Sequence, residues 1–226
     1  MQFGASFYRA GAVCSAISVV TTLLLIFLPE FYAPAEGLEG RMSRVHDPMY
    51  ALRSWVYLVH PFVVLTAALA VAMRIRRRNS VAALVGMLGF LLWAFTEAAQ
   101  QTITLFAFDE WRVAYAAADA TLREHIRANT SMYDGLWDAL YVLLLIGFGA
   151  GNLAIGIAMS KSKGMTRTVG YFFLAAFALT LTNLLPELGG PELPEPLGAW
   201  LYPAIQPLGR ALIGVWLWRY AIDERE

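Results

Sequence analysis

Six long stretches of apolar residues follow one another along the chain and are separated by shorter polar connections. Each is long enough for a helix to cross the hydrocarbon core of a bilayer, which takes about 20 residues. The stretches cover residues 8–28, 54–73, 81–106, 133–159, 169–188 and 197–220. The pattern predicts an all-α fold, namely a polytopic integral membrane protein whose six-transmembrane-helix bundle forms a single domain over residues 1–226.

A further helix is predicted between the third and fourth stretches, over residues 110–127. Trp111, Tyr115 and Ile126 recur there at helical spacing, while charged residues take the other side. This pattern is typical of a short amphipathic helix, which would lie on the outer surface or prolong the third span. Asp109 stands where an N-cap is expected. A lid and a solvated linker both fit such a helix.

Glycines in the fourth stretch indicate close helix packing. Gly147 and Gly151 have the spacing of small residues that lets two membrane helices approach each other. We expect this face to pack inside the bundle rather than to form a dimer interface.

Basic residues in the short connections predict the orientation, because cytoplasmic connections carry an excess of lysine and arginine. Basic residues follow the second, fourth and sixth stretches: Arg74, Arg76, Arg77, Arg78, Lys161, Lys163, Arg167, Arg219 and Arg225. We therefore place these segments, and both the N and C termini, in the cytoplasm. The other connections are mainly acidic and belong outside, although the first of them also carries Arg41, Arg44 and Arg53.

Composition agrees with a membrane protein and excludes other classes. Of the 226 residues, 58% are hydrophobic and only 15% are charged, unlike a typical soluble domain. The 17 basic and 17 acidic residues balance, so no overall field would attract nucleic acid. A single cysteine, Cys14, excludes an intrachain disulfide. The first stretch is longer than a signal-peptide core, and we expect it to be retained as a span. We expect a multi-pass protein in the lipid bilayer of a bacterial inner membrane.

The third stretch carries polar residues where lipid favours hydrocarbon. Glu97, Gln100, Gln101 and Thr104 fall at positions i, i+3, i+4 and i+7 and therefore share one face of a helix. An ionisable residue inside a membrane span is costly and generally faces a bundle interior or a wet cavity. The sequence thus predicts an intramembrane site around Glu97.

Polar residues of four other stretches lie at a similar depth. Counting about 1.5 Å per residue from the outer helix ends places them about 8 to 19 Å into the membrane. They are His60, Asp138, Asn183, Gln206 and Arg210. Few polar residues lie deeper. We expect a cavity that opens to the outside and has its floor near Arg210.

Arg210 keeps its charge at any working pH and needs an acidic partner or carbonyl groups at this depth. Glu97 is the best partner by depth, and Asp138 is the second. An unpaired Glu97 would hold a proton and could donate it. Two carboxyl groups in unequal surroundings suit a division into acid and base. An ion-pair network that only stabilises the bundle would use the same residues.

Proline residues stand next to two of these polar positions. His60 precedes Pro61, which opens the helix near the ring, so the imidazole could relay protons; a satisfied core histidine is the alternative. Pro203 and Pro207 flank Gln206 and predict a broken or kinked sixth helix. Because the spans hold no second histidine, we predict no metal and no cofactor. The chain also lacks G-x-S-x-G, H-E-x-x-H and C-x-x-C motifs.

The first functional hypothesis is a polar pocket, open to the outside, for a lipophilic or amphipathic small molecule. Acid/base chemistry of isomerase or cyclase type would use Glu97 and Asp138, with His60 as a further catalytic candidate. The substrate-binding candidates are Gln100, Gln101, Asn183, Gln206, Arg210, Trp93 and Trp137. Sterol isomerases and membrane terpene cyclases are similar in kind, since they too place acidic residues in compact helical bundles.

Two hypotheses from other classes fit the same pattern. One is a proton-coupled carrier or small-molecule binding protein, in which Arg210 holds an anionic group. The other is a structural subunit whose polar layer meets a partner's membrane helix. The sequence leaves the oligomeric state open.

Overall fold

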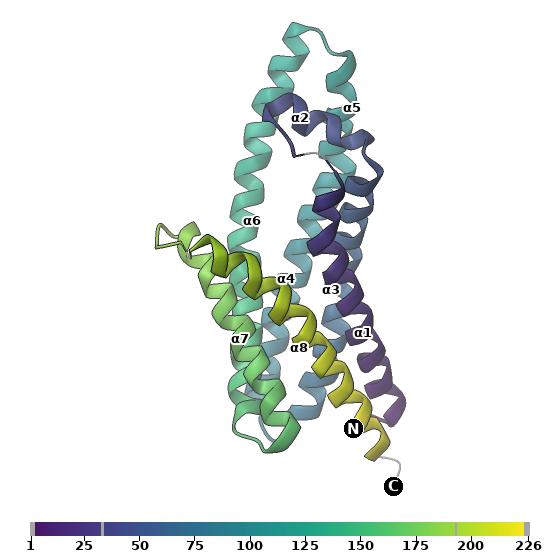
Figure 1. Cartoon of the computed structure of the whole chain (residues 1–226), viewed down its shortest axis with the longest axis vertical. Helices are drawn as coiled ribbons and strands as arrows, with labels where there is room; N and C mark the ends of the chain where they lie inside the picture. The colour runs from purple at the N-terminus through teal and green to yellow at the C-terminus, as the bar shows by residue number, and fades with distance from the viewer. Residues whose placement is uncertain (1–2, 33, 193, 224–226) are drawn as a thin grey trace.

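The computed structural model describes residues 3–32, 34–192 and 194–223, and all regular secondary structure in these ranges is helical. Within them, six long helices form a ring in which each helix contacts its neighbours along the chain (Figure 1). The last helix packs back against the first and closes the ring. Both ends of the described chain lie at the same end of the ring (Figure 1). The predicted all-α fold is confirmed for this part of the chain.

Each predicted apolar stretch falls on one ring helix. The ring consists of α1 (Ala5–Phe27), α3 (Pro48–Ile75), α4 (Ser80–Ile103), α6 (Ala120–Ser160), α7 (Gly164–Glu187) and α8 (Glu195–Asp223). Between α1 and α3 lie the short elements η1 (Leu28–Phe31), α2 (Gly37–Ser43) and η2 (Arg44–His46). A π-helical turn (Thr104–Phe108) and α5 (Asp109–Ala117) continue α4. Arg225, one of the basic residues used for orientation, lies outside the described residues.

Five of these helices are long and apolar enough to cross a membrane, as in a multi-pass membrane protein. They are α1 together with η1, α3, α4 with its continuation to Ala117, α6, and α7. The α8 helix is 29 residues long, but Gln206, Arg210 and two prolines interrupt its apolar sequence, so it is not one of the five. It nevertheless runs through Pro203 and Pro207 without a break at Gln206.

Glycines bring the backbones of α4 and α6 into direct contact. A Cβ atom on Gly89 would lie 2.5 Å from the backbone nitrogen of Gly151, and one on Gly147 would lie 2.7 Å from that of Trp93. Both distances are well below van der Waals contact, so a side chain does not fit at either position. The predicted packing of the α6 glycines inside the bundle is confirmed. This contact fixes the polar face of α4 relative to α6.

A helical hairpin projects from the end of the ring that lies away from the chain ends (Figure 1). We call this the hairpin end and the opposite end the terminus end. The chain turns at Ala118, and the Asp119 carboxylate caps α6 by accepting the Leu122 N–H at 2.8 Å. The segment 110–127 is therefore two helices that prolong α4 and α6. Asp109 lies within the helical path and pairs with Arg112 instead of acting as an N-cap.

A small hydrophobic cluster holds the hairpin against α2. Its buried members are Met42, Phe108, Tyr115 and Ile126. Phe108 also stacks on Tyr133, with ring centroids 4.2 Å apart. The hairpin and α2 thereby form one packed unit above the ring.

Candidate functional site

The ring encloses a cavity of about 840 Å³ that extends toward the hairpin end. Side chains of five ring helices, α3, α4, α6, α7 and α8, supply most of its wall in the described chain, and the elements toward the hairpin end supply most of the rest. All ten site residues predicted from the sequence line it: His60, Trp93, Glu97, Gln100, Gln101, Trp137, Asp138, Asn183, Gln206 and Arg210. The structure therefore brings these residues together around one space, while their roles remain predictions.

One face of α4 supplies the most buried polar group of the wall. Glu97, Gln100, Gln101 and Thr104 are all buried and line the cavity, whereas Phe95 on the opposite face is 62% exposed. This arrangement follows from helical spacing, because positions i, i+3, i+4 and i+7 point in one direction.

Two members of this face join α4 to α6. The Gln100 side-chain amide donates to the Trp137 carbonyl oxygen at 2.9 Å. The Thr104 hydroxyl shares a hydrogen bond of 2.6 Å with the Tyr133 hydroxyl and donates to the Gln100 carbonyl oxygen at 2.8 Å. The amide of Gln100 is thus already engaged, which leaves Gln101 as the freer carboxamide for a ligand.

Arg210 is buried beside the cavity, with 8% of its surface exposed. Its guanidinium group makes no ion pair and no hydrogen bond with any part of the chain that the structure describes, and its Nε is buried. Only its main chain is engaged, as the Ser15 hydroxyl donates to its carbonyl oxygen at 2.6 Å. The predicted ion pair with Glu97 or Asp138 is therefore not formed, although Glu97 is near enough to attract the charge.

The two carboxyl groups of the predicted acid/base pair differ in environment. Glu97 is 7% exposed and lies beside the indole of Trp93. Asp138 is exposed and makes no hydrogen bond or ion pair with the described residues. Burial disfavours the charged form of a carboxyl group, and exposure permits it. The pair thus has the unequal surroundings that a division into proton donor and acceptor requires.

His60 is buried and bonded on one side. Its Nδ1 lies 2.7 Å from the Thr21 hydroxyl of α1, which can itself donate to the main-chain oxygens of Ile17 and Ser18. In that arrangement His60 donates from Nδ1, and its Nε2 carries a free lone pair. The histidine is thus held as a core residue would be, yet its ring also borders the cavity.

A side cavity of about 280 Å³ adjoins the main one toward the α7–α8 connection. Tyr141, Leu179, Asn183 and Tyr202 line both spaces. The Asn183 amide donates to the Leu179 carbonyl oxygen at 3.3 Å, a long hydrogen bond that a ligand group can replace. The side cavity therefore enlarges the space available to a ligand beside Asn183.

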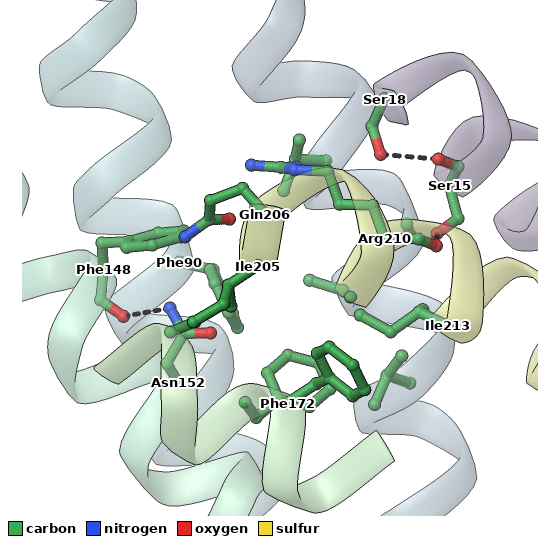
Figure 2. A pocket seen from close by; sticks show the side chains of 17 residues that line it. Ser15, Ser18, Phe90, Phe148, Asn152, Phe172, Ile205, Gln206, Arg210 and Ile213 are labelled. Carbon is green, nitrogen blue, oxygen red and sulfur yellow. Dashed lines mark hydrogen bonds between the residues drawn. The ribbon is translucent and has the colours of Figure 1, made fainter. Parts of the chain in front are cut away.

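A small cavity of about 50 Å³ lies on the terminus side of the main cavity. Figure 2 shows its lining. Gln206 and Arg210 line both cavities, so they stand at the boundary where the floor was predicted. Apolar and aromatic side chains form most of the small cavity. Besides Gln206 and Arg210, its polar members are Ser15, Ser18 and Asn152, and the Asn152 amide donates to the Phe148 carbonyl oxygen at 2.8 Å (Figure 2).

Polar residues around the hairpin end of the cavity were not predicted from the sequence. They are Arg41, Arg44, Tyr50, Arg53, Tyr57, Arg112, Tyr133, Asp134, Tyr141 and Tyr202. One signal identifies part of this set: Tyr50, Arg53, Tyr57 and His60 fall at i, i+3, i+7 and i+10 and share one face of α3. Tyr50 and Arg53 precede the apolar stretch that begins at residue 54, and they belong to the same helix because α3 already starts at Pro48.

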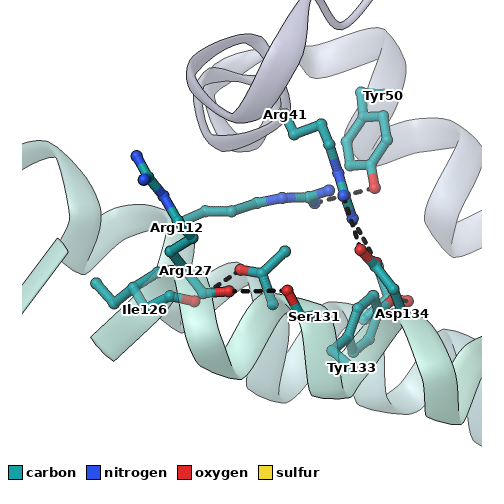
Figure 3. Close-up of polar contacts among 10 residues, drawn as sticks. Arg41, Tyr50, Arg112, Ile126, Arg127, Ser131, Tyr133 and Asp134 are labelled. Carbon is teal, nitrogen blue, oxygen red and sulfur yellow. Dashed lines mark hydrogen bonds and ion pairs between the residues drawn. The ribbon is translucent and has the colours of Figure 1, made fainter. Parts of the chain in front are cut away.

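A bidentate ion pair lies at one side of this region (Figure 3). Arg41 of α2 donates to the two carboxylate oxygens of Asp134 at 2.6 and 2.9 Å. The hydrogen bond and charge of Asp134 raise the pKa of the Arg41 guanidinium further above its usual value. Since the two side chains are 35% and 40% exposed, the cavity reaches the surface here.

Comparison with known protein families, curated proteins and solved structures found no match to this chain. Its function is therefore argued from the geometry of the site.

Proposed function

We propose that this chain is a six-span membrane protein whose cavity binds a lipophilic or amphipathic small molecule. Five helices have the length and apolar character of membrane spans, and α8 takes the sixth place in the same ring. The basic residues that follow α3 and α6 lie at the terminus end, which the proposal places in the cytoplasm. The hairpin end then faces outward, and a bacterial inner membrane remains the predicted location.

Cysteine labelling tests this topology. With Cys14 replaced by serine, Ser131→Cys at the hairpin end should react with a membrane-impermeant maleimide added to intact cells. Ser162→Cys, between α6 and α7, should react only after the cells are opened. The reverse pattern, or labelling of both sites in intact cells, would contradict the proposed orientation.

The buried guanidinium of Arg210 is the observation that carries the binding proposal. A charged group without a hydrogen-bond partner is costly in a low-dielectric interior, and this one borders a large cavity. An anionic or carbonyl-bearing ligand would supply the missing partner. Gln101 and Gln206 line the same cavity, and the rings of Trp93 and Trp137 offer apolar contact surface.

On this ligand, Glu97 would act as the acid and Asp138 as the base. A buried carboxyl group that holds its proton can donate it to a double bond or to an oxygen of the ligand. The exposed carboxyl group of Asp138 would accept the proton that the ligand loses. Isomerisation and cyclisation both combine a proton gain with a proton loss, so this arrangement suits either reaction.

Replacing Glu97 with glutamine tests the acid/base role. The amide has nearly the same shape, so we expect normal yield and thermal stability with a loss of turnover of about 100-fold or more. Native mass spectrometry of protein in mild detergent would first identify the co-purifying molecule, and its conversion would then be followed in proteoliposomes.

Glu124→Gln is the matched control, because Glu124 lies on the exposed side of the hairpin in a pair with Arg127. It should leave turnover unchanged. Equal loss of folded protein and of turnover in Glu97→Gln would instead indicate a structural carboxyl group. Absence of any bound molecule from well-folded protein would count against the binding proposal itself.

The small cavity beyond Arg210 favours a second candidate, a proton-coupled carrier. Ser15, Ser18 and Asn152 line this mainly apolar cavity, which extends the space past the floor of the main cavity toward the terminus end. A carrier would move the molecule across proteoliposome membranes without changing it chemically. Uptake without conversion would therefore select this candidate over the enzyme.

A further inference from the structure

Four arginines gather where the cavity approaches the hairpin end. Arg41 comes from α2, Arg44 from η2, Arg53 from α3 and Arg112 from α5, and all four line the cavity. They come from segments that are separated in the chain, so the fold itself assembles the cluster. Arg41, Arg44 and Arg53 are the basic residues that run against the charge pattern of the connections predicted to lie outside.

Shared aromatic rings hold three of these guanidinium groups, those of Arg41, Arg44 and Arg112, close together. The Tyr50 ring lies 5.7 Å from the guanidinium carbon of Arg44 and 4.8 Å from that of Arg112. The Phe108 ring lies 4.5 Å from Arg112 and 5.9 Å from Arg41. Figure 3 shows Arg41 and Arg112 meeting beside Tyr50. Guanidinium groups that gather around the same rings repel one another, so anions close by stabilise the cluster.

The carboxylates of this region satisfy only half of the cluster. Asp134 pairs with Arg41, and Asp109 pairs with Arg112. Arg44 and Arg53 form no ion pair with the residues that the structure describes; the Tyr57 hydroxyl accepts from Arg53 at 3.3 Å.

Unused hydrogen-bond donors mark the same place. The Nε atoms of Arg44, Arg53 and Arg112 are buried and have no partner among the described residues. Arg112 itself is only 5% exposed, although its terminal nitrogen reaches the Tyr50 hydroxyl at 2.9 Å. Buried donors normally have partners, so these atoms point to a group that is bound when the protein works.

We propose that this cluster binds the phosphate group of an amphipathic molecule whose apolar part extends into the cavity. The proposal rests on the proposed binding function and adds the chemical class of the ligand. Guanidinium groups bind phosphate oxygens in bidentate fashion, and a phosphate monoester offers several acceptor oxygens and more than one negative charge. A carboxylate would satisfy one arginine, whereas this site holds two arginines without a carboxylate partner. Deeper in the cavity, Leu144, Leu145 and Phe148 provide the apolar wall for a chain.

The test uses full-length protein in dodecyl maltoside and three probes. Dihexanoyl phosphatidic acid carries the proposed group on a short lipid, inorganic phosphate carries it alone, and dihexanoyl phosphatidylcholine is a zwitterionic lipid of the same chain length. Equilibrium dialysis gives the affinity of each probe. We expect the phosphatidic acid to bind at least tenfold more tightly than the phosphatidylcholine. Inorganic phosphate that binds equally well would assign the site to a soluble phosphate compound, whereas weak binding of inorganic phosphate assigns it to a lipid.

The variant Arg44→Gln/Arg53→Gln removes the two arginines that have no carboxylate partner. It should weaken binding of the phosphate probe at least tenfold while preserving the elution profile of folded protein. Arg77→Gln/Arg78→Gln removes the same charge from exposed positions at the terminus end and should leave binding unchanged. Should the double variant not fold, Arg44→Gln alone provides the same comparison.

The proposal is overturned if folded wild-type protein binds neither phosphate probe, or if the arginine variants bind as tightly as the wild type. Co-purification of a neutral molecule that depends on Arg210 would overturn the phosphate assignment and leave the proposed function intact. A different result would contradict the proposed function itself: well-folded protein that neither co-purifies with nor binds any small molecule.

Discussion

Replacing Arg210 with methionine is expected to stabilise the empty protein and to abolish ligand binding. The arginine is 8% exposed and its guanidinium group has no hydrogen-bond partner among the described residues, so attraction by Glu97 only partly offsets the cost of burial. Methionine has a similar length and needs no partner. Removing an unsatisfied buried polar group is worth about 1 to 3 kcal/mol, and more for a charged one. A ligand that binds only the wild type stabilises it, so with ligand present the wild type should be more stable than Arg210→Met.

Thermal unfolding in detergent, followed by tryptophan fluorescence with and without the co-purified molecule, measures both effects. Arg127→Met changes an arginine that is 63% exposed and should alter stability by less than about 0.5 kcal/mol. A clear loss of stability in ligand-free Arg210→Met would show that attraction by Glu97 outweighs the cost of burial. The polar layer would then be a structural network.

Replacing Gly147 with leucine is expected to prevent stable assembly of the ring. A Cβ atom at this position would lie 2.7 Å from the Trp93 nitrogen and 2.9 Å from the Gly89 oxygen, so the side chain would meet the backbone of α4. Overpacking an ordinary core costs about 1 to 3 kcal/mol, and a helix backbone yields less than side chains do. Separation of α4 from α6 would also break the Gln100 hydrogen bond to Trp137.

Size-exclusion chromatography of the detergent-solubilised protein gives the fraction of folded material, which we expect to fall several-fold. Gly135→Leu is the matched control on the same helix, because a Cβ atom at Gly135 has no neighbour within 4 Å. It should elute as the wild type does. Equal behaviour of the two variants would mean that α4 and α6 do not meet at these glycines.

The positions of the site residues could be predicted because membrane helices obey simple geometry. The spacing of Glu97, Gln101 and Thr104 predicted their common face, and the rise per residue placed His60, Asn183 and Arg210 within one band of the membrane. Solvation cost then directed these faces inward. The structure places all of them on one cavity, which is the outcome of those rules acting on straight helices.

Pairing of charges could not be predicted, since depth along a helix says nothing about the rotation of its neighbours. Arg210 and Glu97 were matched by depth, yet they form no ion pair in the structure. The arginines of the hairpin end were not predicted as site residues for a different reason. Arg41 and Arg44 lie outside any apolar stretch, and only the folded connection brings them over the cavity.

The closing contact of the ring has a consequence for how the protein is made. From α1 to α8, each ring helix packs against the one synthesised just before it, so a nascent chain can add helices one at a time. Among the ring helices, the α1–α8 contact is the extensive one that joins distant parts of the sequence, beside small contacts of α3 with α6 and α8. Until α8 has been synthesised, the face of α4 that carries Glu97 and Gln101 borders an incomplete ring of helices. Arg210 is therefore synthesised last among the site residues, and the ring around the cavity is complete only when α8 has been made.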